Sequence, residues 1–289
     1  MNQELQKYQE NILRQQHVLS VLLLDNREDS SLVHEGKNLI YLIVLNQPGE
    51  KWETSYLICQ DQIVVEHRIH QWHLEQLSLQ GTDHYLYSLL RQGEVIFDQH
   101  DYLRSNRDRL TRLSHQMRKR RICEEYSVFL QYFLEAKELL HQNHTMDAFQ
   151  AVLKALNGWA RLVVIEAGEI QEAVLWNQVK RLEPTIYKLY EELIAGSEPL
   201  EKRMELLLLP IEFQIMSKMK EATCLITDII NTQNKPWTYE ELKRHPEITD
   251  SRINLGLLLD KMLRRSFIQS VPVRMNDKVV EEQGFCSRE

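Results

Sequence analysis

The segment from Tyr126 to Ile230 restricts the possible folds more than any other part of the chain. Its apolar residues return every three or four positions, as at Phe129 and Phe133, which is the spacing of one buried helix face. Gly168 stands where a helix needs a left-handed last residue, and Pro184 stands where a helix begins. Long amphipathic segments with short joints predict a bundle of about four or five antiparallel helices.

The residues before this bundle predict a different architecture. A polar opening helix is expected over residues 2–16, and short apolar or alternating runs that are typical of strands follow it. The expected strands are Val18–Leu24, Leu39–Leu45, Gln62–Ile69 and Glu94–Asp98. Helical pieces are expected near Gln71–Leu79, Asp83–Arg91 and Tyr102–Cys123. Strands that alternate with helices in this way predict a small α/β domain.

After Asn231 the pattern changes again. Thr238 and Glu241 form a capping-box pair at the start of one helix, and Asp250 begins another that ends near Arg265. Two strands joined as a hairpin follow, at Phe267–Val273 and Lys278–Phe285. This order predicts a winged helix, with the end of the last bundle helix as its first helix. The whole chain is therefore expected to be α+β and mostly helical, with domains at residues 1–116, 117–232 and 233–289.

Charge and cysteine content limit the functional classes. The net charge of −7 gives no global electrostatic reason to bind nucleic acid. The four cysteines are far apart and form no CxxC pair, which is typical of thiols in a reducing compartment. The N-terminus has no apolar signal core, and no apolar run reaches the length of a membrane span. We therefore expect a cytoplasmic protein with no membrane partner.

The first part of the chain resembles the minimal nucleotidyltransferase fold. Members of that family have a strand that ends in Gly-Ser, a second strand with Asp-x-Asp, and a third carboxylate on a neighbouring strand. Here VLLLDNREDSS contains the first strand, NLIYLIVL is the second, and EVIFD resembles the strand that closes the domain. With the helical segment and the tail included, the whole chain resembles the bacterial nucleotidyltransferase-like proteins of Firmicutes. The stretches LWNQVKRLEPTIYKLYEELI and EKRMELLLLP carry this likeness best.

The resemblance implies a set of site positions. Four residues take the nucleotide-binding positions: Asp25, Asn26, Arg27 and Asn38. If the registers match, Asp25 and Asn26 replace Gly-Ser, whereas Asn38 and Ile40 replace the two aspartates. Glu66, on the alternating stretch QIVVEHRIH, matches the third carboxylate and is the candidate catalytic residue.

The replacements matter because nucleotidyl transfer uses two Mg²⁺ ions, which need several anionic oxygen ligands on rigid strands. Asn38 offers one neutral oxygen, Ile40 offers none, and Glu66 alone cannot hold two ions. Glu35 or Asp29 would serve in an offset alignment, but both lie in a predicted loop. We therefore expect a degenerate metal site, with Mg²⁺ as a cofactor only if the chain is a divergent active enzyme. The alternative interpretation of Glu66 is a solvated charge on a sheet face.

Histidines and the bundle offer weaker signals. His67, His70 and His73 recur every three residues, but a strand directs His67 and His70 to opposite faces, so no metal site is assigned. The bundle resembles helical HEPN domains, whose catalytic members use an Arg-x4-His pair on RNA. The nearest match is Arg161, with Glu166 where the histidine would stand. An ion pair between Arg161 and Glu166, or another helix neighbour, is therefore favoured over ribonuclease activity.

Two groups of basic residues are candidates for binding nucleic acid. Between Asp101 and Arg121 the chain has a net charge of +6, which leaves −13 on the remainder. The candidates in this segment are Arg118, Lys119, Arg120 and Arg121, and a solvated helix face is the alternative. From Lys235 onward ten basic residues oppose nine acidic ones, so the tail has no strong basic face. The candidates there are Arg252, Lys261, Arg264 and Arg265.

These observations favour a pseudo-enzyme that binds a nucleotide or a partner and acts as a regulatory protein. A divergent Mg²⁺-dependent nucleotidyltransferase is the first alternative, and a regulator that binds DNA or RNA through the winged helix is the second. The sequence names no specific partner. Nucleotide, nucleic acid and a second copy of the chain all stay open.

Overall fold

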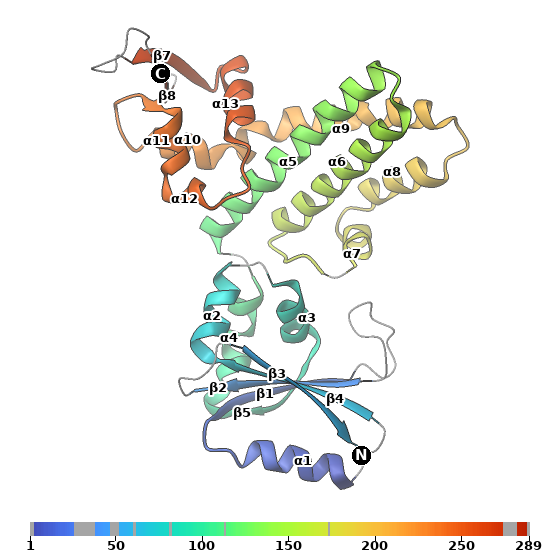
Figure 1. Cartoon of the computed structure of the whole chain (residues 1–289), viewed down its shortest axis with the longest axis vertical. Coiled ribbons are helices and arrows are strands. Elements are labelled where there is room, and N and C mark those ends of the chain that lie inside the picture. Colours follow the sequence, from blue (N-terminus) through green and yellow to red (C-terminus); the bar gives the residue numbers. More distant parts are fainter. Residues whose placement is uncertain are drawn as a thin grey trace. The chain divides into compact units, whose positions relative to one another are not determined.

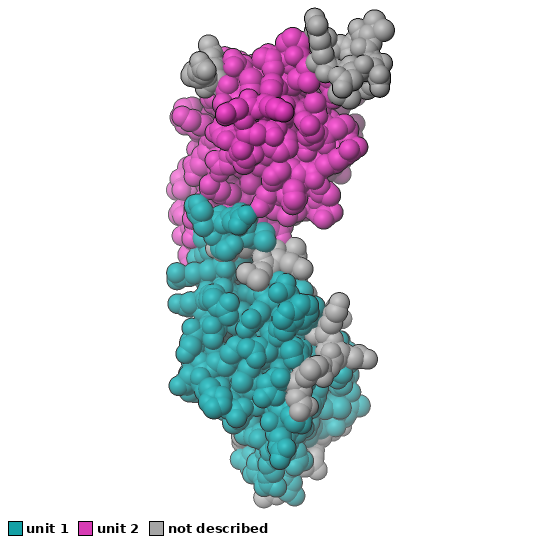
Figure 2. All heavy atoms as spheres, turned by 90° about the vertical axis from the view of Figure 1, so that its left-hand side faces the viewer, with its two compact units in different colours: residues 1–117, 168–174 teal, residues 118–167, 175–289 magenta. Residues whose placement is uncertain are grey.

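The structure is a computed structural model that describes residues 3–25, 38–46, 52–59, 62–80, 83–112, 114–172, 174–273 and 282–287 (Figure 1). It divides into two compact units. Unit 1 comprises residues 1–117 and 168–174, and unit 2 comprises residues 118–167 and 175–289 (Figure 2). The bundle and the tail thus share unit 2. The three predicted domains, with their boundaries after residues 116 and 232, stay a prediction.

Unit 1 is a mixed sheet with helices on both faces (Figure 1). Its elements are α1 (Gln3–Leu13), β1 (Val18–Asp25), β2 (Asn38–Leu45), β3 (Trp52–Cys59), β4 (Gln62–His70), α2 (Gln71–Gln80), α3 (His84–Gln92), β5 (Glu94–Asp98), the 3-10 turn η1 (Gln99–Asp101) and α4 (Tyr102–Thr111). The strand order is β3-β4-β2-β1-β5, and the β2–β4 pair is parallel. Residues of α2, α3 and α4 form one core with the sheet, and α1 covers the other face.

The four expected strands are all present, and β3 is a strand that the sequence pattern did not predict. Most of its residues are exposed because it lies at the edge of the sheet, so it lacks the apolar pattern of the central strands. The single helix expected at Tyr102–Cys123 is two helices, because α4 ends at Thr111 and α5 begins at His115.

Unit 2 contains the predicted helical bundle (Figure 1). Its long elements are α5 (His115–His141, from residue 118 onward in this unit), α6 (Thr145–Glu166), α7 (Leu175–Leu182), α8 (Pro184–Ala195) and α9 (Leu200–Ala222). Phe129 stacks on Trp159 at 6.0 Å between ring centroids, and the Tyr126 hydroxyl donates to the Ile215 carbonyl at 2.7 Å. These contacts join α5 to α6 and to α9. As expected, Gly168 has a left-handed φ of 75°, and Pro184 opens α8.

One bundle helix, α6, is long and apolar enough to cross a membrane by length and composition alone. More than half of that apolar window, 56%, is buried inside the protein. Ala148, Val152 and Trp159 are among its core residues. The apolar character of α6 is therefore accounted for by its place in the bundle core.

The tail has the predicted winged-helix order. Its elements are α10 (Cys224–Ile230), β6 (Trp237–Thr238), α11 (Tyr239–Arg244), α12 (Pro246–Thr249), α13 (Leu255–Arg264), β7 (Ile268–Val273) and β8 (Glu282–Ser287). The capping box between Thr238 and Glu241 is present, with the Glu241 carboxylate accepting from the Thr238 amide at 2.8 Å. The strand order is β6-β8-β7, so β6 adds a third strand to the expected hairpin. The predicted connection between the two hairpin strands, at residues 274–277, lies outside the described residues.

Candidate functional site

The predicted nucleotide-binding edge lies where β1 ends and β2 begins. The antiparallel register places Asp25 beside Leu39, and the Asp25 side chain is exposed. Asn38 is the first residue of β2 and pairs with Ile63 of β4. Asn26 and Arg27 lie outside the described residues, as do Asp29 and Glu35 of the offset alignment.

Ile40, at the second position of the Asp-x-Asp pattern, belongs to the core. Its side chain is 1% exposed and packs in the cluster that includes Val65 and Leu74. This cluster lies on the face of the sheet that α2, α3 and α4 cover. A metal-binding position would need a polar, accessible surrounding, and Ile40 has neither.

Glu66 projects to the other face of the sheet. The parallel register pairs Ile40 with Val65 and Tyr41 with Glu66, and successive residues of a strand alternate between faces. Glu66 therefore lies with Tyr41 on the face covered by α1. It is 6% exposed, so the alternative of a solvated surface charge is wrong. The predicted alternation of the QIVVEHRIH stretch is confirmed, and it separates the two site positions that the family resemblance brought together.

The buried Glu66 carboxylate is compensated locally. Its Oε1 accepts from Arg68 Nε at 2.5 Å, and its Oε2 accepts from the Tyr8 hydroxyl. Arg68 also donates to Gln15 Oε1 at 2.9 Å. Burial, together with the hydrogen bond to Glu66, raises the pKa of the Tyr8 hydroxyl above its usual value, so Tyr8 stays a donor. Arg68 and Tyr8 thus take up both carboxylate oxygens.

These positions do not fit a pair of Mg²⁺ ions. Asn38 and Ile40 supply no carboxylate, and Glu66 faces away from them with both oxygens engaged. Mg²⁺ requires oxygen ligands in octahedral arrangement around one point. Within the ranges described above, no group of three or more His, Cys, Asp and Glu side chains could hold a metal ion.

The carboxylate of Asp98, at the end of the closing strand β5, has a structural role. It accepts from Ser20 Oγ at 2.5 Å, and from the Leu103 and Arg104 amides at 2.9 Å each. Burial alone would raise the pKa of Asp98, but these hydrogen bonds outweigh it and lower the pKa below its usual value. Asp98 thereby fixes β5 to β1 and to the start of α4.

A cavity of about 550 Å³ lies beside β3 and β4 on the face opposite Glu66. His67 lines it, with Nδ1 2.9 Å from Thr54 Oγ1 and Nε2 2.7 Å from the Tyr85 hydroxyl. Trp52 packs at 5.3 Å from the His67 ring, and His73 also lines the cavity. An aromatic lining with a hydrogen-bonded imidazole suits a flat ligand. Sequence reasoning missed this cavity because β3, which supplies Trp52 and Thr54, was not predicted.

The basic candidates at the start of α5 are engaged inside unit 2. Arg118 donates to the Glu166 carbonyl, and Lys119 Nζ lies 2.9 Å from Asp228 Oδ2. Arg120 and Arg121 lie 3.4 and 3.6 Å from the carboxylate oxygens of Glu124, which is 5% exposed. The Lys119–Asp228 hydrogen bond raises the pKa of Lys119. All four cations therefore have partners within the protein.

The predicted partner of Arg161 is different from the observed one. Arg161 Nη1 lies 3.5 Å from Glu125 Oε2, whereas Glu166 pairs with Lys218. The expected pair of Arg161 with Glu166 is therefore wrong, because Arg161 of α6 pairs with Glu125 of the neighbouring helix α5. Glu125 also accepts from Arg252 of the tail at 2.9 Å. A buried carboxylate thus joins two bundle helices to the winged helix.

The four tail candidates do not form one open basic face. Arg252 contacts Glu125 of the bundle, and Arg264 pairs with Asp260 on its own helix at 3.0 Å. Arg265 donates to the Met216 sulfur on α9. Lys261 and Arg265 instead line a cavity between α13 and the bundle, which Arg264 also borders.

Comparison with known proteins assigns a description to each part of the chain. Residues 1–118 match the family model "Nucleotidyltransferase-like", and residues 118–218 match "YgxA-like substrate binding domain". Residues 225–285 match "Helix-turn-helix domain". The predictions of a nucleotidyltransferase-like first part and a helix-turn-helix tail are confirmed. The HEPN-like nature of the bundle stays a prediction.

Two similar proteins cover nearly the full length. The chain is 28% identical over 274 residues to "Uncharacterized protein YgxA" of Bacillus subtilis (strain 168), which covers 93% of this chain and 91% of that protein. The crystal structure of a nucleotidyltransferase-like protein from Exiguobacterium sibiricum 255-15 superposes with a TM-score of 0.72 at 24% identity. That match covers 97% of this chain and 96% of the other, and it confirms the α+β fold class.

Proposed function

Because the parts of this chain match a nucleotidyltransferase-like domain, a YgxA-like substrate binding domain and a helix-turn-helix domain, we propose that it is a non-catalytic regulatory protein. In this proposal it binds a nucleotide or a protein partner and does not transfer nucleotides through two metal ions. The opposite orientations of Ile40 and Glu66 carry the proposal.

The chemistry of transfer supports this interpretation. Two Mg²⁺ ions must contact the attacking and leaving oxygens at once, and shared carboxylates normally hold them together. Ile40 lies in an apolar core, and Glu66 is used by Arg68 and Tyr8 on the far face. A single substitution would not restore the site, because the side chain at position 66 would still face α1.

The cavity around His67 in unit 1 supports a role in ligand binding. The cavity around His67 is lined by Trp52, Tyr56 and Tyr85, which offer flat apolar surfaces, and by Asp83. Among the residues that the structure describes, its lining contains no lysine or arginine, so a neutral aromatic group such as a base fits it better than a triphosphate. The proposal places this protein in the cytoplasm, which agrees with the absence of disulfides among its four cysteines.

The test combines binding and turnover on the full-length protein. Each of the four nucleoside triphosphates is titrated calorimetrically with and without Mg²⁺, and pyrophosphate release is followed in parallel. We expect any binding to be independent of Mg²⁺ and no pyrophosphate to appear. Mg²⁺-dependent binding with pyrophosphate release would replace this proposal by the divergent enzyme.

Regulation through DNA is a second candidate, favoured by the helix-turn-helix match. Lys261 and Arg264 lie on α13, the helix that precedes the β7–β8 hairpin. A mobility-shift assay with random-sequence duplex DNA at several salt concentrations tests it. Binding that weakens steeply with salt would support contacts to phosphate, whereas no shift at low salt would contradict this second function.

A further inference from the structure

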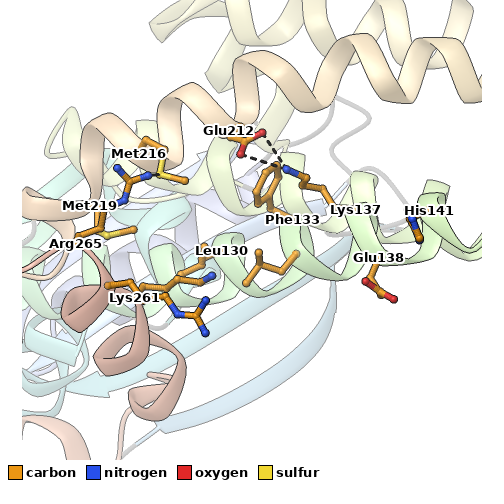
Figure 3. A pocket seen from close by; sticks show the side chains of 12 residues that line it. Leu130, Phe133, Lys137, Glu138, His141, Glu212, Met216, Met219, Lys261 and Arg265 are labelled. Carbon is orange, nitrogen blue, oxygen red and sulfur yellow. Dashed lines mark hydrogen bonds and ion pairs between the residues drawn. The ribbon is translucent and has the colours of Figure 1, made fainter.

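We propose that the cavity between α5, α9 and α13 is a binding site for a small anionic molecule with an apolar body. The cavity has a volume of about 550 Å³ and lies wholly within unit 2 (Figure 3). Such a volume is typical of sites for drug-sized ligands, roughly 300–1,000 Å³. The family description of residues 118–218 names no substrate and does not include α13, so the inference goes beyond the proposed function.

The floor of the cavity is apolar. Leu130 and Phe133 of α5 face Met216 and Met219 of α9, and all four line the space (Figure 3). Leu130, Phe133 and Met219 are buried, whereas Met216 is 38% exposed. Thioether side chains adapt their shape to a ligand because they have several rotatable bonds and a polarisable sulfur. The floor therefore suits an aromatic or aliphatic group.

One end of the cavity carries positive charge from the winged helix. Lys261 and Arg265 reach in from α13 and its C-cap (Figure 3). Within the described ranges, neither residue forms an ion pair, and Arg265 donates to the Met216 sulfur. Sulfur is a weak acceptor, so an oxygen anion would be a stronger partner for the guanidinium. By contrast, Lys137 farther along is already paired with Glu212 at 3.1 Å.

An anion at this end would be shared by two domains. Its apolar body would contact α5 and α9, and its charge would contact Lys261 and Arg265 beside the hairpin of the winged helix. Binding would thus link the bundle to the helix-turn-helix tail through one ligand.

The probe is 1-anilinonaphthalene-8-sulfonate, which combines an aromatic body, an anionic group and a fluorescence signal. We expect saturable binding of one molecule per chain to the full-length protein. Lys261→Gln and Arg265→Gln should each weaken binding about tenfold, since each removes one charge-assisted contact. Arg244→Gln, on exposed α11 of the same tail, is the matched control and should change nothing. Near-UV circular dichroism checks that each variant is folded.

Competition identifies the source of the anion. Displacement of the probe by ATP would indicate a nucleoside phosphate, and displacement by decanoate would indicate a fatty acid. Displacement by neither, non-saturable binding, or an affinity in both Gln variants that equals that of the wild type would overturn the proposal. If a variant does not fold, the salt dependence of probe binding to the wild type tests the proposal instead. An anion held by two cations must bind more weakly as salt rises, so affinity that is independent of salt would contradict the proposal. None of these readouts depends on turnover in unit 1.

Discussion

Ile40 and Glu66 lie on the neighbouring parallel strands β2 and β4 and face opposite sides of the sheet. Ile40 packs under α2 to α4, and Glu66 packs under α1 with Tyr41. Ile40 pairs with Val65, and Glu66 is the next residue along β4. Because successive residues of a strand point to opposite faces, the Ile40 and Glu66 side chains are separated by the sheet. A register shift of one residue would reverse this arrangement, but it would also move Val65 and Ile69 out of the core under α2 to α4.

The structural role of Glu66 gives the first prediction. Glu66→Gln should lower the free energy of unfolding by about 1.5–3 kcal/mol, because Arg68 loses a buried charged partner. Nucleotide binding, where it occurs, should be unchanged. Urea unfolding and calorimetry measure the two effects. Glu94→Gln is the control, since Glu94 is an exposed strand carboxylate of the same unit. Loss of Mg²⁺-dependent nucleotide binding without a change in stability would instead make Glu66 a metal ligand.

Much of unit 1 followed from local pattern. Alternation in β4 predicted that His67 and Glu66 face opposite sides, and the structure confirms it. The family resemblance, however, matched Glu66 by position along the chain and took no account of the face. That comparison requires the register of β2 against β4, which two separate sequence stretches cannot specify on their own.

The contacts that sequence reasoning missed are long-range. Glu125 meets Arg252 across 127 residues, and nothing near either residue indicates the pairing. The expected neighbour of Arg161 was Glu166, because only contacts one helical turn away are visible in a sequence. Edge strand β3 was missed for a related reason, since exposed strands lack the apolar pattern that identifies central ones.

Asp98 provides a pH-dependent prediction. Its pKa in the folded protein is lowered from the usual value of about 3.9 in an unfolded chain. The stabilisation is therefore fully present above about pH 4 and is lost as the pH falls through the folded pKa. Asp98→Ala should lower stability at neutral pH by about 1–2 kcal/mol and reduce the loss of stability in acid.

Thermal unfolding between neutral pH and about pH 3 measures this difference. Asp108→Ala is the control, because Asp108 is exposed on α4 of the same unit. Parallel pH profiles for the wild type and Asp98→Ala would show that the hydrogen bonds from Ser20 and the α4 amides do not control the acid limb.

Arg120 and Arg121, at the start of α5, should contribute to the stability of the fold and not to RNA binding. Replacing Arg120 and Arg121 with alanine leaves Glu124 buried without its cations, at a cost of about 1–3 kcal/mol. Affinity for poly(U) should keep the same salt dependence. Thermal unfolding and filter binding measure both, with Lys202→Ala at an exposed pair as the control. A salt slope that falls by about one per replaced arginine would indicate direct phosphate contacts instead.

Gly158 permits the close approach of α6 to α5. A Cβ at this position would lie 3.2 Å from both Cα and Cβ of Phe129, which is buried and cannot easily move. Gly158→Ala gains up to about 1 kcal/mol in helix propensity but loses about 1–3 kcal/mol through overpacking, so we expect net destabilisation. Gly256→Ala is the matched helical control, because its nearest atoms, on the Tyr239 ring, lie at 3.9 Å. Urea unfolding should show stability falling in the first variant and rising slightly in the second. If stability rises in both variants, helix propensity outweighs packing at the α5–α6 contact.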